Sequence, residues 1–302
     1  MTKPTSVGFE GQQGAHSEGV AITLFSTVAA LKANVQTVGL ESFEALFNAV
    51  NEGKLDYAVV PIENSSTGTF YKVLDLLQSH QLSIVGETTR REIHHLCALP
   101  GTAIDKLTEV RSHPYAIEQC RLFLSGFGKK LSIGQSLDTA ASASEIKQKS
   151  LETTGTIISK RAAEIYGLQI LKENIEDDPN NITRYVLIAR DPVVPERHTD
   201  PRTVISVVLK NNTGALMKVM SAFSLRDINI CKIESRPSPR TNKLSHPWEY
   251  IMYVDIDGTV AESNVNNAIR HISEFAQVRV LGSFPRYPAP TDAPLGILGI
   301  GI

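Results

Sequence analysis

The 302-residue sequence lacks several features that mark common protein classes. Its three cysteines, Cys97, Cys120 and Cys231, are far apart, which predicts reduced, buried thiols in a cytosol-like compartment rather than a disulfide framework. No Cys or His pair has metal-ligand spacing, because the neighbours His94 and His95 would point to different sides of a strand. The formal net charge of -2 gives no basic footprint for nucleic acid.

Long hydrophobic runs and targeting signals are also missing. No apolar run approaches the roughly 18 residues that a membrane span needs, and the N-terminus has neither a signal-peptide core nor a transit-type stretch. We therefore expect a cytoplasmic protein that binds no nucleic acid and no membrane. The alternative is the plastid stroma, if a transit segment has been removed. The apolar fraction of 42 % is sufficient for a core without disulfides or metal.

The first 190 residues alternate strand-like and helical runs, which predicts an α/β architecture. Gly53 is placed to end one helix and Pro61 to end one strand. Pro114 is placed to start a helix that continues to about residue 127. The expected strands are at 7–10, 35–39, 57–60, 82–85, 93–99, 156–159 and 185–189, and further helices are at 15–31, 43–50, 70–77 and 140–149.

Residues 191–201 contain Pro192, Pro195 and Pro201 without any periodicity, which predicts a linker. Beyond it, the pattern predicts the order β-α-β-β-α-β of a ferredoxin-like domain. Its strands are expected at 204–210, 228–235, 249–256 and 278–284. The predicted organisation is thus a catalytic domain at 1–190, a linker at 191–201, a second domain at 202–287 and a flexible tail at 288–302, whose apolar end has no explanation.

Four polar clusters lie where a predicted strand hands over to a helix. They are GQQGAHS at 11–17, ENSSTG at 63–68, SHP at 112–114 and DTAA at 138–141. Ligands of open α/β sheets bind at the carboxyl ends of strands, where helix N-termini offer free N–H groups and partial positive charge. Any one cluster could simply be a helix cap. Four of them, with the polar segment 181–184, favour one site for a small, anionic ligand.

Common catalytic motifs are absent. The sequence has no nucleophile elbow, no P-loop and no complete Rossmann fingerprint, and Gly11-x-x-Gly14 alone is weak evidence for a phosphate loop. We therefore expect a reaction without cofactor or metal that depends on positioning the substrate.

Five ordered blocks resemble the prephenate dehydratase family, which includes the arogenate dehydratases. They are VPIENSSTG at 60–68, SHPYAIEQC at 112–120, DTAASA at 138–143, AAEIYGL at 162–168 and NITRY at 181–185. The resemblance extends over about residues 6 to 286. It implies a two-lobed catalytic region, similar to periplasmic solute-binding domains, followed by a regulatory ACT domain.

The resemblance also implies a reaction. Prephenate would lose CO2 and its 4-hydroxyl group to form phenylpyruvate in phenylalanine biosynthesis, or arogenate would form phenylalanine directly. Thr183 is the implied catalytic residue, which would hydrogen-bond the leaving oxygen or relay a proton through water. Arg184 could bind a substrate carboxylate or pair structurally. The implied substrate-binding residues are Asn64, Ser65, Ser112, Gln119, Thr139 and Arg184.

Two segments of the second domain resemble the phenylalanine-binding segments of ACT domains. The implied effector-binding residues are Gly214, Ala215, Leu216, Glu234, Ser235 and Arg236. Without the resemblance, residues 234–237 would be a strand end stopped by proline. The resemblance implies phenylalanine as effector, with inhibition expected and activation as the alternative. It also implies a homodimer or homotetramer formed through the ACT domains.

The sequence departs from the family motifs at several positions. His16 stands where an aromatic residue is usual, Gln12 where proline is usual, and Tyr185 replaces the phenylalanine of a Thr-Arg-Phe motif. His16 could face solvent at a helix start or contact the substrate. The sequence does not distinguish prephenate from arogenate. The alternative of another class is a non-enzymatic, metabolite-sensing ACT protein.

Overall fold

The computed structural model describes residues 4–27, 34–136, 139–195, 200–237 and 249–287. The chain divides into two compact units. The first contains Met1–Leu76 and Thr88–Val186, and the second contains Leu77–Glu87 and Leu187–Tyr287. The second unit therefore takes in a segment, Leu77–Glu87, that the sequence pattern assigned to the catalytic domain.

The predicted linker is partly visible. Residues 191–195 have no helix or strand, residues 196–199 lie outside the described residues, and Pro201 already begins a strand. The expected tail at 288–302 lies outside the described residues.

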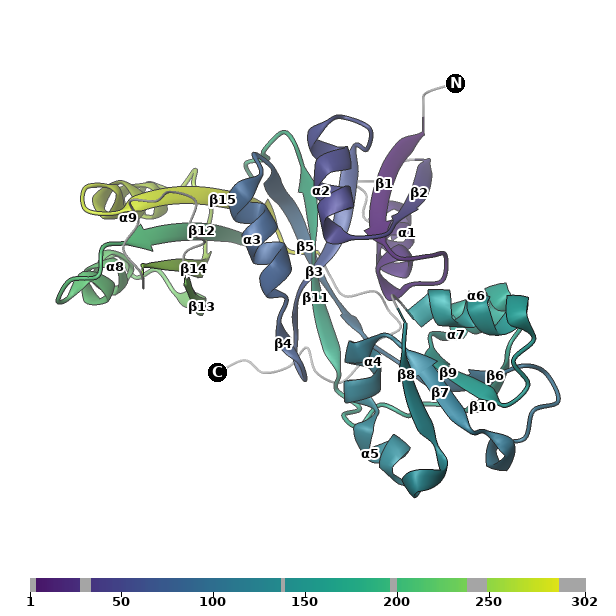
Figure 1. The fold of residues 1–302 in the computed structure, drawn as a ribbon. Coiled ribbons are helices and arrows are strands. Elements are labelled where there is room, and N and C mark those ends of the chain that lie inside the picture. The colour runs from purple at the N-terminus through teal and green to yellow at the C-terminus, as the bar shows by residue number, and fades with distance from the viewer. Residues whose placement is uncertain (1–3, 28–33, 137–138, 196–199, 238–248, 288–302) are drawn as a thin grey trace. The chain divides into compact units, whose positions relative to one another are not determined.

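The first unit begins with a parallel sheet in which β1 pairs with both β2 and β3 (Figure 1). Strand β11 lies between β3 and β5 in this sheet. The elements are β1 (Thr5–Glu10), α1 (His16–Thr27), β2 (Val35–Leu40), α2 (Phe43–Asn51), β3 (Tyr57–Asn64), β4 (Gly68–Thr69), α3 (Tyr71–Ser79), β5 (Ser83–Arg91) and β11 (Ile182–Ala189).

Two local expectations in this part have different outcomes. Gly53 follows the end of α2 with a φ of +77°, a left-handed conformation that favours glycine, as predicted. The expectation that Pro61 ends its strand is wrong, because β3 continues to Asn64. Strand β3 pairs with β1 only at Tyr57 and Ala58, so the missing N–H of Pro61 disrupts no hydrogen bond to β1.

The first unit also contains a five-stranded sheet in the order β10-β6-β9-β7-β8. Successive residues of β6 alternate between two cores, with Leu96 and Ala98 in one and Cys97 in the other. The elements are β6 (His95–Ala98), η1 (Ile104–Lys106), β7 (Glu109–Ser112), α4 (Pro114–Gln119), α5 (Arg121–Ser125), η2 (Gly128–Lys130), β8 (Ser132–Gln135), α6 (Thr139–Lys149), β9 (Thr154–Ile158), α7 (Lys160–Tyr166) and β10 (Gln169–Lys172).

The helix expected from Pro114 to about residue 127 is interrupted. Cys120 has a φ of -121° and separates α4 from α5. The carboxylate of Asp177 accepts hydrogen bonds from the backbone N–H of Leu122 and of Phe123, so it caps the second helix from outside the segment.

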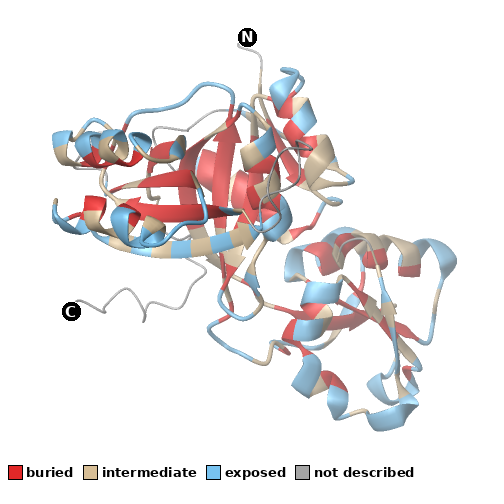
Figure 2. Cartoon of the chain, turned by 60° about the vertical axis from the view of Figure 1, so that its left-hand side comes forward, coloured by how far each residue is buried: buried red, intermediate tan, exposed pale blue. Residues whose placement is uncertain are grey.

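The second unit has the predicted β-α-β-β-α-β order. It consists of β12 (Pro201–Leu209), α8 (Ala215–Ser224), β13 (Ile230–Pro237), β14 (Tyr250–Asp257), α9 (Ser263–Ser273) and β15 (Gln277–Pro285). The strands lie in the order β13-β14-β12-β15, and each neighbouring pair in this order is antiparallel. Both helices bury one face, which includes Val219 and Phe223 of α8 and Val265 and Ile272 of α9 (Figure 2). The predicted α/β class and the ferredoxin-like second domain are thus confirmed.

Residues Leu77–Glu87 join the second unit through polar contacts that the sequence pattern does not reveal. The guanidinium group of Arg279 donates to the backbone oxygens of Gln78, His80 and Leu82. The hydroxyl of Ser206 donates to the side-chain oxygen of Gln78 at 2.7 Å.

The cysteines are free thiols, but one prediction about them is wrong. Cys97 and Cys120 are buried as expected, whereas Cys231 is exposed. Cys231 lies on β13, the edge strand of its sheet, and its thiol donates to Asp257. Among the described helices, none is long and apolar enough to cross a membrane.

Candidate active site

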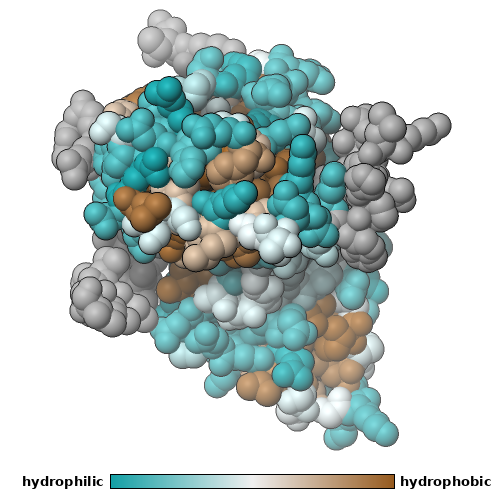
Figure 3. Space-filling model, turned by 90° about the vertical axis from the view of Figure 1, so that its left-hand side faces the viewer, coloured by the Kyte–Doolittle hydropathy of each residue, from teal (hydrophilic) through white to brown (hydrophobic). Residues whose placement is uncertain are grey.

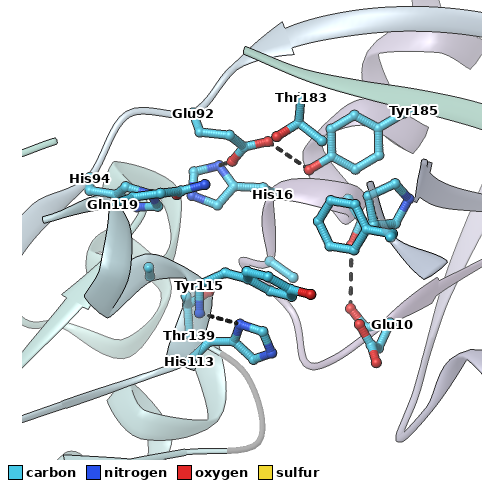
Figure 4. Close-up of a pocket in the computed structure, with 15 residues that line it drawn as sticks. Glu10, His16, Glu92, His94, His113, Tyr115, Gln119, Thr139, Thr183 and Tyr185 are labelled. Carbon is cyan, nitrogen blue, oxygen red and sulfur yellow. Dashed lines mark hydrogen bonds and ion pairs between the residues drawn. The ribbon is translucent and has the colours of Figure 1, made fainter. Parts of the chain in front are cut away.

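A cavity of about 120 Å³ lies in the first unit, and its wall combines side chains from β1, β3 and β11 with side chains from loops and from the helices α1, α4 and α6 (Figure 4). Its volume suits a small molecule. It is lined by Glu10, Ala15, His16, Ser17, Pro61, Phe70, Glu92, His94, His113, Tyr115, Ala116, Gln119, Thr139, Thr183 and Tyr185.

The loop between β1 and α1 forms one wall, and Gly14 fixes its position. Gly14 has a φ of +96°, and a Cβ atom there would lie 2.8 Å from Cα of Ala162. The hydroxyl of Ser159 donates to the carbonyl oxygen of Gly14 and caps α7 by accepting from the N–H of Ala162. The glycine therefore allows the loop to pack directly on the start of α7.

Asn64 joins the end of β3 to the start of β11. Its side-chain oxygen accepts from the N–H groups of Ser66 and Thr67, both at 2.9 Å. Its amide nitrogen donates to Oγ1 of Thr183 at 2.8 Å and to Oδ1 of Asn181 at 2.7 Å. Asn64 and Thr183 are almost completely buried. Thr183 accepts the bond from Asn64 and is also hydrogen-bonded to Tyr185, so both partners orient its hydroxyl.

A buried carboxylate links His16 to Tyr185. Figure 4 shows Glu92 between the two side chains, with Thr183 next to them. Oε2 of Glu92 lies 2.7 Å from Nδ1 of His16, and the Tyr185 hydroxyl donates to Oε1 at 2.6 Å. Burial alone would raise the pKa of Glu92, but the charge and hydrogen bond of His16, with the bond from Tyr185, lower it well below its usual value.

His94 is held next to this group by Gln119, the last residue of α4. Nε2 of His94 lies 2.6 Å from Oε1 of Gln119, so the ring donates there. The rings of His16 and His94 meet edge to face with centroids 5.3 Å apart. Burial and the neighbouring charge of His16 lower the pKa of His94 to about 4, so His94 is neutral at neutral pH.

Three helices begin at the cavity wall. Helix α1 starts at His16, α4 at Pro114 beside Tyr115, and α6 at Thr139. The N-terminal ends of helices carry partial positive charge and free N–H groups. The described lining contains no lysine or arginine, so these helix ends and the histidines are its means of binding an anion.

The predicted site residues fall into two groups. Thr183, Gln119 and Thr139 line the cavity, and Asn64 supports Thr183 from behind. Ser65, Ser112 and Arg184 are not part of the lining.

The three predicted residues that do not line the cavity contact other parts of the chain. Ser112 is fully buried and donates to the backbone oxygen of Ile157 at 2.6 Å. The Ser65 hydroxyl accepts from the N–H of Ile182, and Arg184 lies 3.6 Å from Glu63. Asp138, which begins the third cluster, lies outside the described residues.

Sequence reasoning missed several lining residues, above all Glu92, His94 and Glu10. Glu92 and His94 follow β5 outside any cap-like cluster, and the contacts of Glu92 come from residues far away in the chain. A carboxylate and a histidine two positions apart, directly after β5, were the only local signal.

The predicted effector residues lie in the second unit. Gly214 precedes α8 with a φ of +77°, and a Cβ atom there would meet nothing within 4 Å. The segment Glu234–Arg236 ends β13, next to Pro237, which pairs with Tyr250. Tyr250 in turn pairs with Leu209, the last residue of β12. The Gly214 segment therefore follows the end of β12, and Glu234–Arg236 belongs to the last part of β13, at the same end of this sheet.

No group of three or more His, Cys, Asp or Glu side chains within the described ranges is placed to hold a metal ion.

Proteins with sequences similar to this chain are named as prephenate or arogenate dehydratases. Residues 7–193 match the family described as prephenate dehydratase. The chain is 39 % identical to arogenate dehydratase 1 of Petunia hybrida, over 94 % of this chain and 68 % of that protein. It is also 39 % identical to the chloroplastic arogenate dehydratase/prephenate dehydratase 6 of Arabidopsis thaliana, over 94 % of this chain and 70 % of that protein.

A solved structure is similar over almost the whole length. The prephenate dehydratase of Arthrobacter aurescens in complex with L-Phe is 28 % identical, with a TM-score of 0.81, and the match covers 98 % of this chain and 93 % of that one. Together these matches show that the chain belongs to the prephenate dehydratase family and is a prephenate/arogenate dehydratase, a carbon–oxygen lyase of phenylalanine biosynthesis.

Proposed function

We propose that the enzyme converts prephenate to phenylpyruvate, water and CO2, with Thr183 hydrogen-bonding the departing 4-hydroxyl group. The observation that carries this proposal is the buried hydroxyl of Thr183, which lines the cavity and accepts a hydrogen bond from Asn64. The amide fixes the rotamer of Thr183, and a substrate oxygen would replace Tyr185 as the acceptor of the Thr183 proton.

The helix starts at the cavity wall support a dianionic ring as substrate. Prephenate carries two carboxylates, and the cavity offers the starts of α1, α4 and α6. Thr139 adds a polar side chain at the start of α6, and Gln119 adds one from the last residue of α4. Aromatisation of the ring drives the loss of CO2, so the protein must mainly orient the substrate and provide a proton.

Arogenate is the second candidate, because the Petunia relative is named for arogenate and the Arabidopsis relative for both substrates. Arogenate has an ammonium group in place of the side-chain keto group, and Glu10 in the cavity wall is an anionic residue that could face it.

The decisive experiment compares the turnover of both substrates by the purified protein. Phenylpyruvate is followed by its absorbance and phenylalanine by amino-acid analysis. We expect kcat/KM to be at least about tenfold higher for prephenate, a difference of about 1.4 kcal/mol in transition-state binding. The opposite ratio would assign the enzyme to arogenate, and no turnover of either substrate would refute the proposed function.

Phenylalanine is the proposed effector, bound at the segments Gly214–Leu216 and Glu234–Arg236. The complex of the Arthrobacter enzyme with L-Phe supports this assignment. We expect inhibition, because an end product that binds better to a less active state shifts the population towards it. Titration of turnover with phenylalanine tests this, and a flat response would refute it.

The second unit is also the proposed site of self-association. Its sheet ends at β13, where Ile233 is 40 % exposed, and α8 exposes Leu216 and Met217. In the face shown in Figure 3, hydrophobic residues stand in small groups among hydrophilic ones. A homodimer or homotetramer through these domains is expected, which light scattering after gel filtration would test. Cytoplasm is the expected compartment, although the Arabidopsis relative is named chloroplastic.

A further inference from the structure

The leaving hydroxyl group needs a proton, and a threonine hydroxyl is a poor acid. Three histidines line the cavity that contains Thr183. His113 caps α4, where its Nδ1 accepts from the N–H of Tyr115. His94 donates to Gln119 and is neutral at neutral pH, as described above. His16 differs from both, because its ring contacts a buried carboxylate.

The carboxylate of Glu92 needs a positive partner. The residue is only 5 % exposed, and an unpaired charge at such a position is very unfavourable. Nδ1 of His16 lies 2.7 Å from one oxygen of this carboxylate and supplies the positive charge when the imidazole is protonated, while the neutral hydroxyl of Tyr185 satisfies the other oxygen. The protonated imidazole carries a second N–H on Nε2.

That second N–H is not used by the protein. Nε2 of His16 is buried and makes no hydrogen bond within the described residues. The ring nevertheless belongs to the cavity wall, with a side-chain exposure of 12 %. Thr183 and Tyr185 are two residues apart on β11 and therefore face the same side, where Tyr185 reaches Glu92. The imidazole of His16 and the hydroxyl of Thr183 thus belong to the wall of the same cavity.

We propose that His16 is the proton donor to the departing hydroxyl group, and that Glu92 holds His16 in its charged form and orientation. This rests on the proposed dehydration of prephenate or arogenate. The bond from the ring to the carboxylate carbon breaks and releases CO2, and its electron pair enters the ring. The C–O bond breaks, and the oxygen leaves as water with the proton of His16 Nε2. Neutral His16 then regains a proton from solvent.

Two of the residues involved are departures from the family motifs. His16 replaces an aromatic residue and Tyr185 replaces a phenylalanine, and both contact the same carboxylate. Glu92, His16 and Tyr185 thus form a single group of a carboxylate, its histidine partner and its hydroxyl donor. Glu92 and Tyr185 are positioning residues in this group, and His16 is the residue that meets the substrate.

Besides His94, three of the titratable groups near His16 have shifted pKa values. The pKa of Glu92 is lowered, the pKa of Tyr185 is raised well above its usual value by burial and by Glu92, and burial lowers the pKa of His95. The titratable groups that face His16 are Glu10 at the end of β1, Glu92, His94 and His95 after β5, His113 and Tyr115 at the start of α4, and Tyr185 on β11.

The first test is the pH dependence of kcat for the wild type and for His16→Gln. The wild type should lose activity on the alkaline side as His16 loses its proton, and His16→Gln should lack this limb. Loss of a general acid should lower kcat by about 10²–10⁴-fold, while KM changes by less than about threefold. A wild-type profile without an alkaline limb between pH 5 and about 9, or a variant with nearly normal kcat and an unchanged limb, overturns the proposal.

Glu92→Gln distinguishes proton donation by His16 from a merely structural role of this residue. The amide keeps the size of the side chain but removes the charge that holds the proton on His16. The alkaline limb should therefore move to lower pH, and an unmoved limb overturns the proposal even if His16→Gln fails to fold. His113→Gln, which removes another histidine of the cavity wall, should keep the limb. If the wild type turns over neither prephenate nor arogenate, the proposed function itself fails, whereas active enzyme with an unaffected His16→Gln profile refutes only the role of His16.

Discussion

The side-chain nitrogen of Asn64 lies 2.8 Å from the hydroxyl oxygen of Thr183, although 119 residues separate the two. This bond determines which way the Thr183 hydroxyl can donate. Asn64 also accepts from the N–H groups of Ser66 and Thr67, so one side chain sets both the loop after β3 and the proposed catalytic hydroxyl.

Replacing Thr183 tests its hydroxyl directly. Thr183→Val keeps the shape but leaves no donor for the leaving oxygen and no acceptor for Asn64. We expect kcat to fall by about 10²–10³-fold, as for the loss of one hydrogen-bond donor in the transition state. Thr183→Ser keeps the hydroxyl and should remain within about tenfold of the wild type. Equal activity of the two variants would contradict the assignment, provided that circular dichroism shows both to be folded.

Ser112 should matter for stability rather than for turnover. Its hydroxyl is fully buried and donates to the backbone oxygen of Ile157, which joins β7 to β9. Ser112→Ala leaves that oxygen without this donor and should lower the free energy of unfolding by about 1–3 kcal/mol. Urea unfolding measures this loss, and kcat should stay within about twofold. A stable variant with strongly reduced kcat would instead restore Ser112 as a substrate-binding residue.

The order of strands and helices could be predicted from the sequence because hydrophobic periodicity is local information. The same holds for Thr139, which begins a helix as its cap-like cluster suggested. Ser112 belongs to a similar cluster, but its hydroxyl faces the neighbouring strand, and the sequence does not show which way a side chain turns at a strand end. Cap-like residues therefore indicate where a site lies. They do not show which residues line the cavity and which only support those residues.

Glu92 could not be predicted, because its role depends on contacts with distant parts of the chain. Tyr185 follows it by 93 residues, and His16 precedes it on another element. Burial of a carboxylate becomes visible only when these partners are in place. The departures at His16 and Tyr185 could be recognised in the sequence, but the carboxylate that joins them could not.

The stability of the fold should depend on pH through His94. Its pKa is lowered from 6.5 to about 4 by burial and by the charge of His16. Between these two values the unfolded chain binds a proton that the folded chain does not, so the free energy of unfolding should fall as the pH drops from 6.5 to about 4.

Urea unfolding at a series of pH values measures this dependence. His94→Gln cannot titrate and should show a flatter curve in this window. Glu92 acts in a separate, more acidic window, because its pKa falls from 4.5 to about 2 and its stabilisation is lost as the pH drops through that range. The His94 variant should keep this second decline. Parallel curves for the wild type and the variant between pH 6.5 and 4 would contradict the prediction.

Two glycines with similar backbone angles should respond differently to alanine. Gly14 and Gly68 have φ values of +96° and +82°, so alanine strains the backbone at both. This strain costs about 1–2 kcal/mol. At Gly14 the new Cβ would also lie 2.8 Å from Cα of Ala162, whereas at Gly68 it meets nothing within 4 Å. Thermal unfolding should therefore show a much larger loss for Gly14→Ala, and equal losses would mean that the loop can move away from α7.

The proposed phenylalanine site can be tested with two exposed leucines of the same region. Leu216 lies in the first turn of α8, next to Gly214, and is 49 % exposed, whereas Leu225 follows the other end of the helix and is 78 % exposed. If phenylalanine binds at the start of α8, Leu216→Ala removes apolar contact with the ligand and should raise the half-inhibitory concentration by about tenfold, which corresponds to about 1.4 kcal/mol of binding energy. Leu225→Ala removes a side chain of equal size directly after the same helix and should leave the response to phenylalanine unchanged. A shift for Leu225→Ala with none for Leu216→Ala would place the effector at the opposite end of α8, next to Asp227 and Asn229.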